Sequence, residues 1–257
     1  MRLARVGLHI AQGVATAACV FPFAGNPRRR VHVQRWSIAL LDILGVRLHV
    51  HGTRPTMADV PLMVVANHIS WLDIMAINAV LPVRFVAKSE VRSWPLVGWL
   101  CAKVGTLFIE RGQRRAAAHV SAQLVRLMRE GTPVAVFPEG TTTDGSEVRG
   151  FHSSLLQPAV LAGARVWPVA LRYVRADGTP CREAAFTGEM SLWESLHLVT
   201  AKRRIRAELL FLPALEGRTP HRRELARAAR ASILQSLSLP APHSPAGTAG
   251  GPRAAGH

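Results

Sequence analysis

The chain has 257 residues, 49% of them hydrophobic, which is enough for a buried core and excludes a disordered chain. Its 32 Lys and Arg residues outnumber 16 Asp and Glu residues, and the net charge of +16 favours a polyanionic partner, either nucleic acid or an anionic membrane. The aromatic content of 6% is low for base stacking, so no nucleic-acid partner is expected. Three widely spaced cysteines and the absence of P-loop, GxGxxG and HExxH patterns disfavour a disulfide scaffold, a CxxC site and the best-known NTPase, dinucleotide and metalloprotease classes.

Residues 1–35 contain no acidic side chain and carry arginines on both sides of an uncharged stretch, residues 6–27. The apolar part of this stretch is short for a spanning helix, which needs about 20 residues. We interpret residues 1–35 as a membrane-associating helical segment that lies in the bilayer interface or half-inserts, with its arginines at anionic headgroups. A signal peptide and a helix buried within the protein are the alternatives.

Short strand-like segments follow along the chain. Residues 46–51 alternate apolar and polar side chains, as a half-buried strand does, and residues 62–67 form the continuous apolar run of a fully buried strand. The further strand candidates are residues 83–87, 106–110, 133–138, 165–174 and 204–212.

Helical patterns lie between these strands. The clearest helices span residues 114–130, where Gly131 ends the helix, and residues 220–238. Alternating strands and helices predict a single α/β domain, residues 36–239, with a mostly parallel central sheet flanked by helices. Residues 240–257 are rich in Pro, Gly and Ala and are predicted to be a disordered tail.

Polar clusters directly follow four of the predicted strands. In an open parallel sheet the functional site lies at the carboxyl ends of the strands, so these clusters locate a candidate site. They are residues 67–73, 87–90, 110–112 and 138–145.

The first cluster reads NHISWLD, and Ser70 is the expected N-cap of a following helix. His68 would then lie just outside the helix and Asp73 in its first turn, so that the two side chains can meet. A carboxylate bound to one imidazole nitrogen fixes the tautomer and leaves the other nitrogen as a general base. The alternative is a structural histidine beside a capping carboxylate.

In the last cluster, a buried strand leads into Glu139, Gly140 and a row of threonines. The Asp-Gly pair at 144–145 is typical of a turn. Because Glu139 directly follows a buried strand, we expect its carboxylate to point into the crevice rather than toward solvent.

Together these residues resemble the glycerolipid acyltransferase family, whose members acylate lysophosphatidic acid and related lysolipids. Residues 67–73 resemble its NHxxxxD motif, residues 105–111 its Gly-x-x-Phe-Ile-x-Arg motif and residues 137–141 its FPEGT motif. Residues 166–170 resemble its fourth motif, a short strand with a central Pro. Order and spacing agree over roughly residues 36–212.

The resemblance implies a role for each matching residue. His68 would deprotonate the acceptor hydroxyl, which attacks an acyl thioester directly, and Asp73 would orient His68 and stabilise its charge. Cationic residues would bind the anionic headgroup of the acceptor, and the FPEGT segment would shape that pocket. The implied substrate-binding residues are Lys88, Arg111, Glu139, Gly140, Thr141 and Thr142.

The implied function is an O-acyltransferase that moves a fatty acyl group from acyl-ACP or acyl-CoA to a lysophospholipid hydroxyl. The first expected acceptor is 1-acyl-sn-glycerol-3-phosphate, which gives phosphatidic acid. No cofactor and no metal are expected. The expected partners are membrane lipids and the acyl carrier, and the expected location is the cytoplasmic face of a bacterial inner membrane, as a peripheral or monotopic protein.

One departure from the family pattern concerns the acceptor. Many lysophosphatidate acyltransferases continue FPEGT with Arg-Ser, whereas Thr142 and Thr143 stand here, and residues 151–155 lack the common Phe-Lys-x-Gly run. Because a cationic phosphate contact is missing, lyso-ornithine lipid or another lysolipid is an alternative acceptor. The sequence also leaves open a thioesterase-like hydrolase and a non-catalytic basic protein that binds membranes or nucleic acid.

Overall fold

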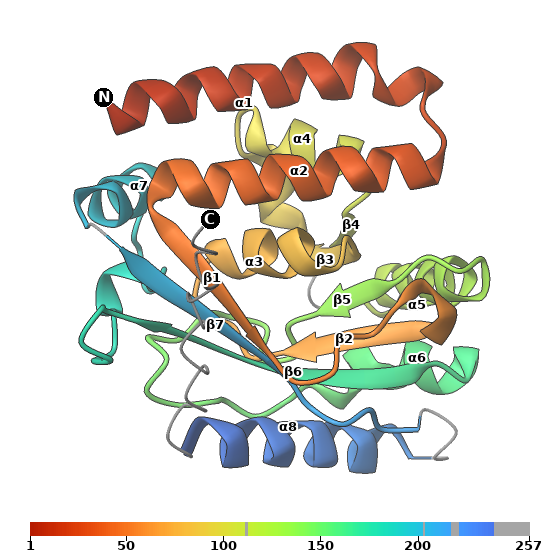
Figure 1. The fold of residues 1–257 in the computed structure, drawn as a ribbon. Coiled ribbons are helices and arrows are strands. Elements are labelled where there is room, and N and C mark those ends of the chain that lie inside the picture. Colours follow the sequence, from red (N-terminus) through yellow and green to blue (C-terminus); the bar gives the residue numbers. More distant parts are fainter. Residues whose placement is uncertain (111–112, 203, 217–220, 239–257) are drawn as a thin grey trace, which may run out of the picture.

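The computed structural model describes residues 1–110, 113–202, 204–216 and 221–238. A seven-stranded sheet carries helices on both faces, and two long N-terminal helices stack on one side (Figure 1). The strands are β1 (Val46–His51), β2 (Leu62–Ala66), β3 (Arg84–Lys88), β4 (Leu107–Ile109), β5 (Val134–Val136), β6 (Arg165–Val174) and β7 (Ile205–Phe211). The helices are α1 (Arg2–Cys19), α2 (Asn26–Leu44), α3 (Leu72–Val80), α4 (Val97–Lys103), α5 (Arg114–Arg129), α6 (Gln157–Ala162), α7 (Leu192–Ala201) and α8 (Arg222–Ser238).

The strand order across the sheet is β1-β7-β6-β2-β5-β3-β4. Every neighbouring pair is parallel except β6 and β7, so β1 and β7 run opposite to the other five strands. The predicted mostly parallel sheet flanked by helices is therefore confirmed. The carboxyl ends of β2, β3, β4 and β5 share one edge of the sheet, where the four polar clusters begin.

Strand β2 shows why its sequence is apolar throughout. Leu62 and Val64 belong to a core cluster with α3, while Met63 and Val65 belong to the cluster formed with α5, α6 and α8. All of β2 is buried, because helices cover both faces of the sheet at its centre.

The N-terminal segment is helical, as predicted, and its two helices form a hairpin. A short 3₁₀ turn, Phe21–Phe23, joins α1 to α2, and Pro27 lies in the first turn of α2, where a missing N–H costs nothing. The predicted boundary between residues 35 and 36 falls inside α2. The C-terminal half of α2 buries Leu40, Leu41 and Leu44 in the core, so α2 is part of the folded domain.

Reciprocal hydrogen bonds join the two helices of the hairpin. Nε2 of His9 lies 2.9 Å from the carbonyl oxygen of Trp36, and Nε1 of Trp36 donates to the carbonyl of His9 at 3.0 Å. The two rings stack with their centroids 4.8 Å apart. Gly13 leaves room for the indole, because a Cβ at this position would lie 2.6 Å from Nε1 of Trp36.

Candidate active site

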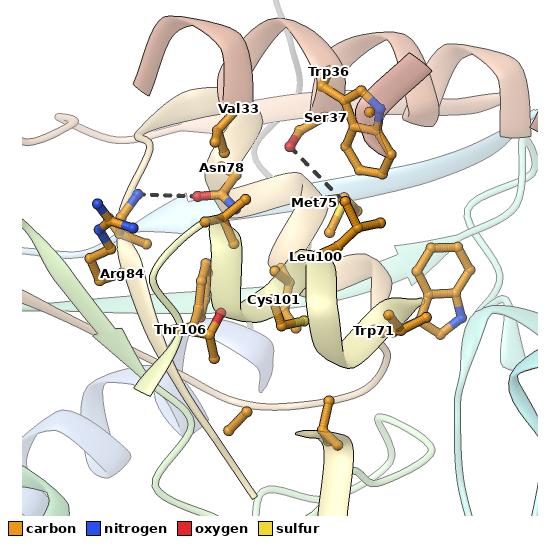
Figure 2. Close-up of a pocket in the computed structure, with 18 of the residues that line it drawn as sticks. Val33, Trp36, Ser37, Trp71, Met75, Asn78, Arg84, Leu100, Cys101 and Thr106 are labelled. Carbon is orange, nitrogen blue, oxygen red and sulfur yellow. Dashed lines mark hydrogen bonds between the residues drawn. The ribbon is translucent and has the colours of Figure 1, made fainter. Parts of the chain in front are cut away.

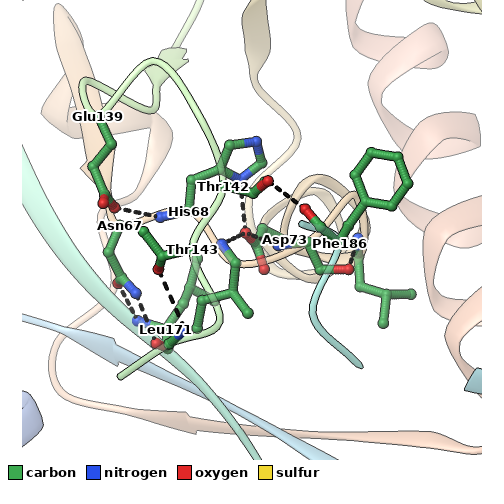
Figure 3. A network of polar contacts seen from close by, with 12 residues as sticks. Asn67, His68, Asp73, Glu139, Thr142, Thr143, Leu171 and Phe186 are labelled. Carbon is green, nitrogen blue, oxygen red and sulfur yellow. Dashed lines mark hydrogen bonds and ion pairs between the residues drawn. The ribbon is translucent and has the colours of Figure 1, made fainter. Parts of the chain in front are cut away.

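His68 and Asp73 are in contact, as the spacing of the first motif predicts. Nδ1 of His68 lies 2.8 Å from Oδ2 of Asp73 (Figure 3). His68 follows the carboxyl end of β2, and Asp73 lies in the first turn of α3. The N-cap of α3 is Trp71 rather than the predicted Ser70, whose hydroxyl instead accepts the N–H of Leu72 at 3.3 Å.

The Asp73 carboxylate is fully buried and accepts four hydrogen bonds. Its Oδ2 accepts the backbone N–H groups of Ile69 at 2.7 Å and Ser70 at 2.9 Å in addition to the His68 contact. Its Oδ1 accepts the hydroxyl of Tyr173 at 2.6 Å. Four donors offset the loss of water around this carboxylate and fix its orientation toward the imidazole.

The His68 ring is held from a second side by Phe137. The two rings stack with centroids 3.9 Å apart and an interplanar angle of 9°. The His68 side chain is 19% exposed, and within the described part of the chain its Nε2 has no hydrogen-bond partner. The second ring nitrogen is therefore available to a substrate, as general-base chemistry requires.

Asn67 joins the start of the loop between β2 and α3 to the neighbouring strand β6. Its amide donates to the carbonyl of Leu171 at 3.0 Å, and its Oδ1 accepts the N–H of Leu171 at 2.7 Å. Asn67 is buried, and its side chain satisfies the backbone N–H and C=O of Leu171. It thereby fixes the position of the neighbouring His68 relative to the sheet.

Glu139 does not point into the crevice, which corrects the expectation from the sequence. It is buried, and its two carboxylate oxygens accept the backbone N–H groups of His68 and Arg149, each at 2.8 Å. Burial raises the pKa of Glu139, and the two N–H bonds partly oppose this shift. Glu139 thus joins the loop after β2 to the loop after β5 instead of facing a substrate.

The residues that follow Glu139 do line a cavity, namely Gly140, Thr141 and Thr142. The Thr142 hydroxyl donates to the carbonyl of Phe186, and the N–H of Phe186 donates to the carbonyl of Ile69 at 2.9 Å. The hydrogen of the Thr142 hydroxyl is thus committed to the protein, which leaves only its oxygen lone pairs for a ligand.

One large cavity, with a volume of about 1340 Å³, runs from His68 beneath the helical hairpin. Its walls are mostly apolar and come from α1, α2, α3, α4 and the loops at the carboxyl edge of the sheet (Figure 2). The labelled side chains in this view are Val33, Trp36 and Ser37 of α2, Trp71, Met75 and Asn78 at α3, Arg84 of β3, Leu100 and Cys101 of α4, and Thr106. The hairpin and the His68 loop therefore enclose one continuous space.

Of the two cations predicted for the headgroup pocket, Lys88 and Arg111, the structure describes only Lys88. Lys88, the last residue of β3, lines the same cavity as His68. Arg111 lies outside the described residues, so its predicted contact stays a prediction. Within the described residues, no group of three or more His, Cys, Asp or Glu side chains could hold a metal ion.

The residue that sequence reasoning missed is Tyr173, in the second half of β6. Its side chain looks like an ordinary strand residue in a sequence. Only the parallel pairing of β6 with β2, which aligns Ala66 with Val169, brings it beside the first turn of α3.

Comparison with known proteins shows which family this chain resembles. The model of a family described as Acyltransferase matches residues 47–172. The lyso-ornithine lipid O-acyltransferase of Pseudomonas aeruginosa is 37% identical over 243 residues, which cover 92% of each chain. The 1-acyl-sn-glycerol-3-phosphate acyltransferase of Neisseria meningitidis is 42% identical over 151 residues, covering 59% of this chain and 58% of that one.

A solved structure shows the same fold. The crystal structure of PlsC, the 1-acyl-sn-glycerophosphate acyltransferase of Thermotoga maritima, superposes with a TM-score of 0.61 at 21% identity. The match covers 93% of this chain and 97% of that one. Because a relative is 37% identical to it over 92% of both chains, this chain is a member of the acyltransferase family.

Proposed function

We propose that the protein is an O-acyltransferase that moves a fatty acyl group from an acyl thioester to the free hydroxyl of a lysolipid. The observation that carries this proposal is the His68–Asp73 contact of 2.8 Å at the mouth of a large apolar cavity. A general base beside an apolar space suits a reaction between two lipid substrates.

The geometry supports a direct transfer. With Nδ1–H of His68 donated to Asp73, Nε2 takes the proton of the acceptor hydroxyl as its oxygen attacks the thioester carbonyl. The new C–O ester bond forms, the C–S bond breaks, and the imidazolium returns the proton to the leaving thiolate. Asp73 stabilises the imidazolium charge throughout. Acyl-ACP or acyl-CoA is a substrate in this scheme, and no cofactor takes part.

The headgroup of the acceptor would bind where cations meet the catalytic loop. Lys88 supplies one charged donor within the cavity, and Arg111 is proposed as the second. Gly140 and Thr141 would form the floor of this pocket, because they line the cavity directly after the carboxyl end of β5.

Two acceptors are candidates. For 1-acyl-sn-glycerol-3-phosphate, support comes from the Neisseria relative and from Lys88 in the cavity. For lyso-ornithine lipid, a specific observation is Thr142, which carries no charge and gives its hydroxyl hydrogen to Phe186. A pocket that lacks the Arg found after FPEGT in many lysophosphatidate acyltransferases is better matched to a zwitterionic headgroup than to a phosphate dianion. The Pseudomonas relative, similar over 92% of both chains, points the same way.

The helical hairpin would place the enzyme on a membrane. The helix extends beyond the uncharged stretch whose apolar part is short for a span: residues 2–23 are long and apolar enough to cross a bilayer by length and composition alone. Exposed apolar side chains of the hairpin include Leu8, Phe23, Val31 and Ile38. We propose peripheral or monotopic binding at the cytoplasmic face of a bacterial inner membrane, where acyl carriers and lysolipids meet.

The first experiment offers labelled acyl-ACP and acyl-CoA to the purified protein, with lysophosphatidic acid and lyso-ornithine lipid as competing acceptors. The lipid products identify the acceptor, and free fatty acid without acylated lipid would identify a hydrolase. No transfer with either donor, together with steeply salt-dependent nucleic-acid binding, would favour a non-catalytic basic protein.

The His68→Ala variant tests the mechanism in the same assay. We expect the transfer rate to fall by about 10²- to 10⁴-fold, the usual contribution of a general base. His119→Ala is the control, because His119 is an exposed histidine on α5 away from the cavity. A folded His68→Ala protein with full activity would rule out this mechanism.

A further inference from the structure

Tyr173 is the only tyrosine of the chain, and its hydroxyl is buried beside the candidate active site. It donates to Oδ1 of Asp73 at 2.6 Å, the short distance typical of a hydroxyl bound to a carboxylate. Within the described residues, this is the only side chain that contacts Oδ1, since the His68, Ile69 and Ser70 nitrogens all bind Oδ2.

Strand β6 supports both ends of the motif that contains the two catalytic candidates. The backbone of Leu171 pairs with the side chain of Asn67, and two residues further along, Tyr173 holds Asp73. Both contacts come from strand β6, the first through the backbone of Leu171 and the second through the side chain of Tyr173. The loop between Asn67 and Asp73, which carries His68, is therefore fixed to β6 at two points.

We propose that Tyr173 is a positioning residue of the transfer reaction, whose hydroxyl sets the plane of the Asp73 carboxylate and through it the direction of His68. This inference rests on the proposed transferase function. Without the phenol, Oδ1 becomes a buried acceptor with no hydrogen-bond partner among the described residues, and the donors at Oδ2 alone fix the plane of the carboxylate. The Nε2 atom would then be aimed less well at the acceptor hydroxyl.

The surroundings of Tyr173 keep it a donor. Burial, followed by the negative charge of Asp73, raises the pKa of the phenol well above its usual value. Two further titratable residues of the described part of the chain are linked to it: His68 shares Asp73 with it, and Cys181 donates its backbone N–H to the Tyr173 carbonyl at 2.8 Å. The phenol therefore stays protonated across the pH range in which the enzyme would work.

Tyr173→Phe removes the hydroxyl and retains the ring. We expect kcat to fall about 10- to 100-fold, the usual range for losing a hydrogen bond to a charged group, with KM for donor and acceptor unchanged. Ser236→Ala is the control: it removes a buried hydroxyl on α8, bonded at 3.1 Å to the Ile233 carbonyl, and should leave kcat unchanged.

A spectroscopic test does not depend on activity. Biosynthetic replacement of tyrosine by 3-fluorotyrosine places one ¹⁹F label at Tyr173, because the chain has no other tyrosine. We expect its resonance at neutral pH to move when Asp73→Asn removes the charge from Oδ1, and to stay in place in the Ser236→Ala protein. An unmoved resonance in the Asp73→Asn protein would show that the contact is absent in solution and would overturn the proposal.

The outcomes separate this inference from the function on which it rests. If the parent protein transfers acyl groups and Tyr173→Phe retains its full kcat, the positioning role is wrong and the transferase function stands. If the parent protein transfers none, the proposed function fails, and the ¹⁹F result still decides whether Tyr173 holds Asp73. A fall in kcat with a matching rise in KM would indicate general disorder of the site and would also contradict a positioning role.

Discussion

Two buried carboxylates, Asp73 and Glu139, hold the loop that carries His68, and each does so by accepting backbone N–H groups. Asp73 binds the N–H groups of Ile69 and Ser70, while Glu139 binds those of His68 and Arg149. A carboxylate that accepts two backbone donors acts as a rigid clamp between chain segments. At the scale of single residues, the acidic side chains of both motifs are thus partly structural, and His68 is the member that presents a ring nitrogen to the cavity.

The Glu139→Gln substitution tests this clamp. One amide oxygen can replace one carboxylate oxygen, but the amide NH₂ would face a second N–H group, so one buried donor loses its acceptor. We expect the unfolding free energy to fall by about 1–3 kcal/mol, and the transfer rate to fall as well, because the backbone of His68 is displaced. Urea denaturation gives the first quantity. Glu147→Gln, an exposed carboxylate of the same loop, is the control that should change little.

The difference in stability between the parent protein and Glu139→Gln should change with pH in a defined direction. Burial raises the pKa of Glu139 above the ordinary value of 4.5 that the unfolded chain has. The folded protein therefore keeps the proton of the Glu139 carboxyl to a higher pH than the unfolded chain does. The contribution of Glu139 to stability is therefore largest below pH 4.5 and decreases as pH rises through its folded pKa. We expect the stability advantage of the parent protein over Glu139→Gln to shrink along this range. An advantage that grows with pH would contradict the raised pKa.

Thr142 is the residue at which acceptor choice is tested. Thr142→Arg introduces a cation beside the proposed headgroup pocket, and we expect the product ratio in the competition assay to move about 10-fold toward phosphatidic acid. Thr142→Val removes the hydroxyl bonded to Phe186 without adding charge. If both variants shift the ratio equally, the contact to Phe186 and not the charge at this position governs the choice.

At the scale of elements, the position of α4 against the cavity depends on one close backbone approach. The segment Ser89–Ser93 lies against α4, and a Cβ at Gly98 would overlap the carbonyl groups of Arg92 and Val91. Leu100 and Cys101 of the same helix line the cavity. A glycine is therefore required where α4 meets this turn, for steric reasons and not for backbone conformation.

Gly98→Ala should accordingly push α4 away from the turn. We expect a loss of about 1–3 kcal/mol in unfolding free energy, the range for overpacking a tight contact, with reduced transfer activity. Gly7→Ala is the matched control in α1, where an added Cβ meets nothing within 4 Å. Because alanine favours helices over glycine by about 1 kcal/mol, Gly7→Ala should be neutral or stabilising. Thermal melts of both variants compare the two, and equal effects would contradict the steric argument.

At the scale of the whole molecule, charge and apolar surface act together on one side. The hairpin exposes Leu8 (74%) and Phe23 (88%), and α2 begins with Arg28, Arg29 and Arg30. The other face of the sheet is covered by α5, α6 and α8. The hairpin side thus combines a long apolar helix with a run of arginines, which is the combination that binds anionic bilayers.

Leu8→Asp should weaken binding to vesicles that contain phosphatidylglycerol. The variant loses an apolar contact worth about 1.5–3 kcal/mol and adds a charge of the wrong sign, so we expect at least a tenfold drop in the association constant for the vesicles. Leu161→Asp makes the same change on α6, at a leucine that is 52% exposed, and should bind as the parent protein does. Vesicle sedimentation measures both, and binding of the parent protein should weaken with added salt. Equal loss in the two variants would contradict a role for the hairpin.

Most of the sheet could be predicted from the sequence because strand signals are local. The continuous apolar run of β2 and the alternation of β1 are visible within a few residues, and the predicted ends of both strands lie within one residue of the observed ones. The contact between His68 and Asp73 is equally local. His68 and Asp73 are five residues apart across the start of a helix, so their side chains are close enough to meet.

Only the tertiary structure decided how that pair is supported and what it faces. The contacts of His68 with Glu139 and of Asp73 with Tyr173 span 71 and 100 residues, and they exist because β5 and β6 lie on either side of β2. Hydrophobic periodicity predicts that a segment is a strand, but it carries no information on which strand lies beside it. The cavity beneath the hairpin depends likewise on α1 folding back on α2. The sequence by itself thus determined the strands and the contact between His68 and Asp73, while the strand order determined the residues that support this pair and the cavity that it faces.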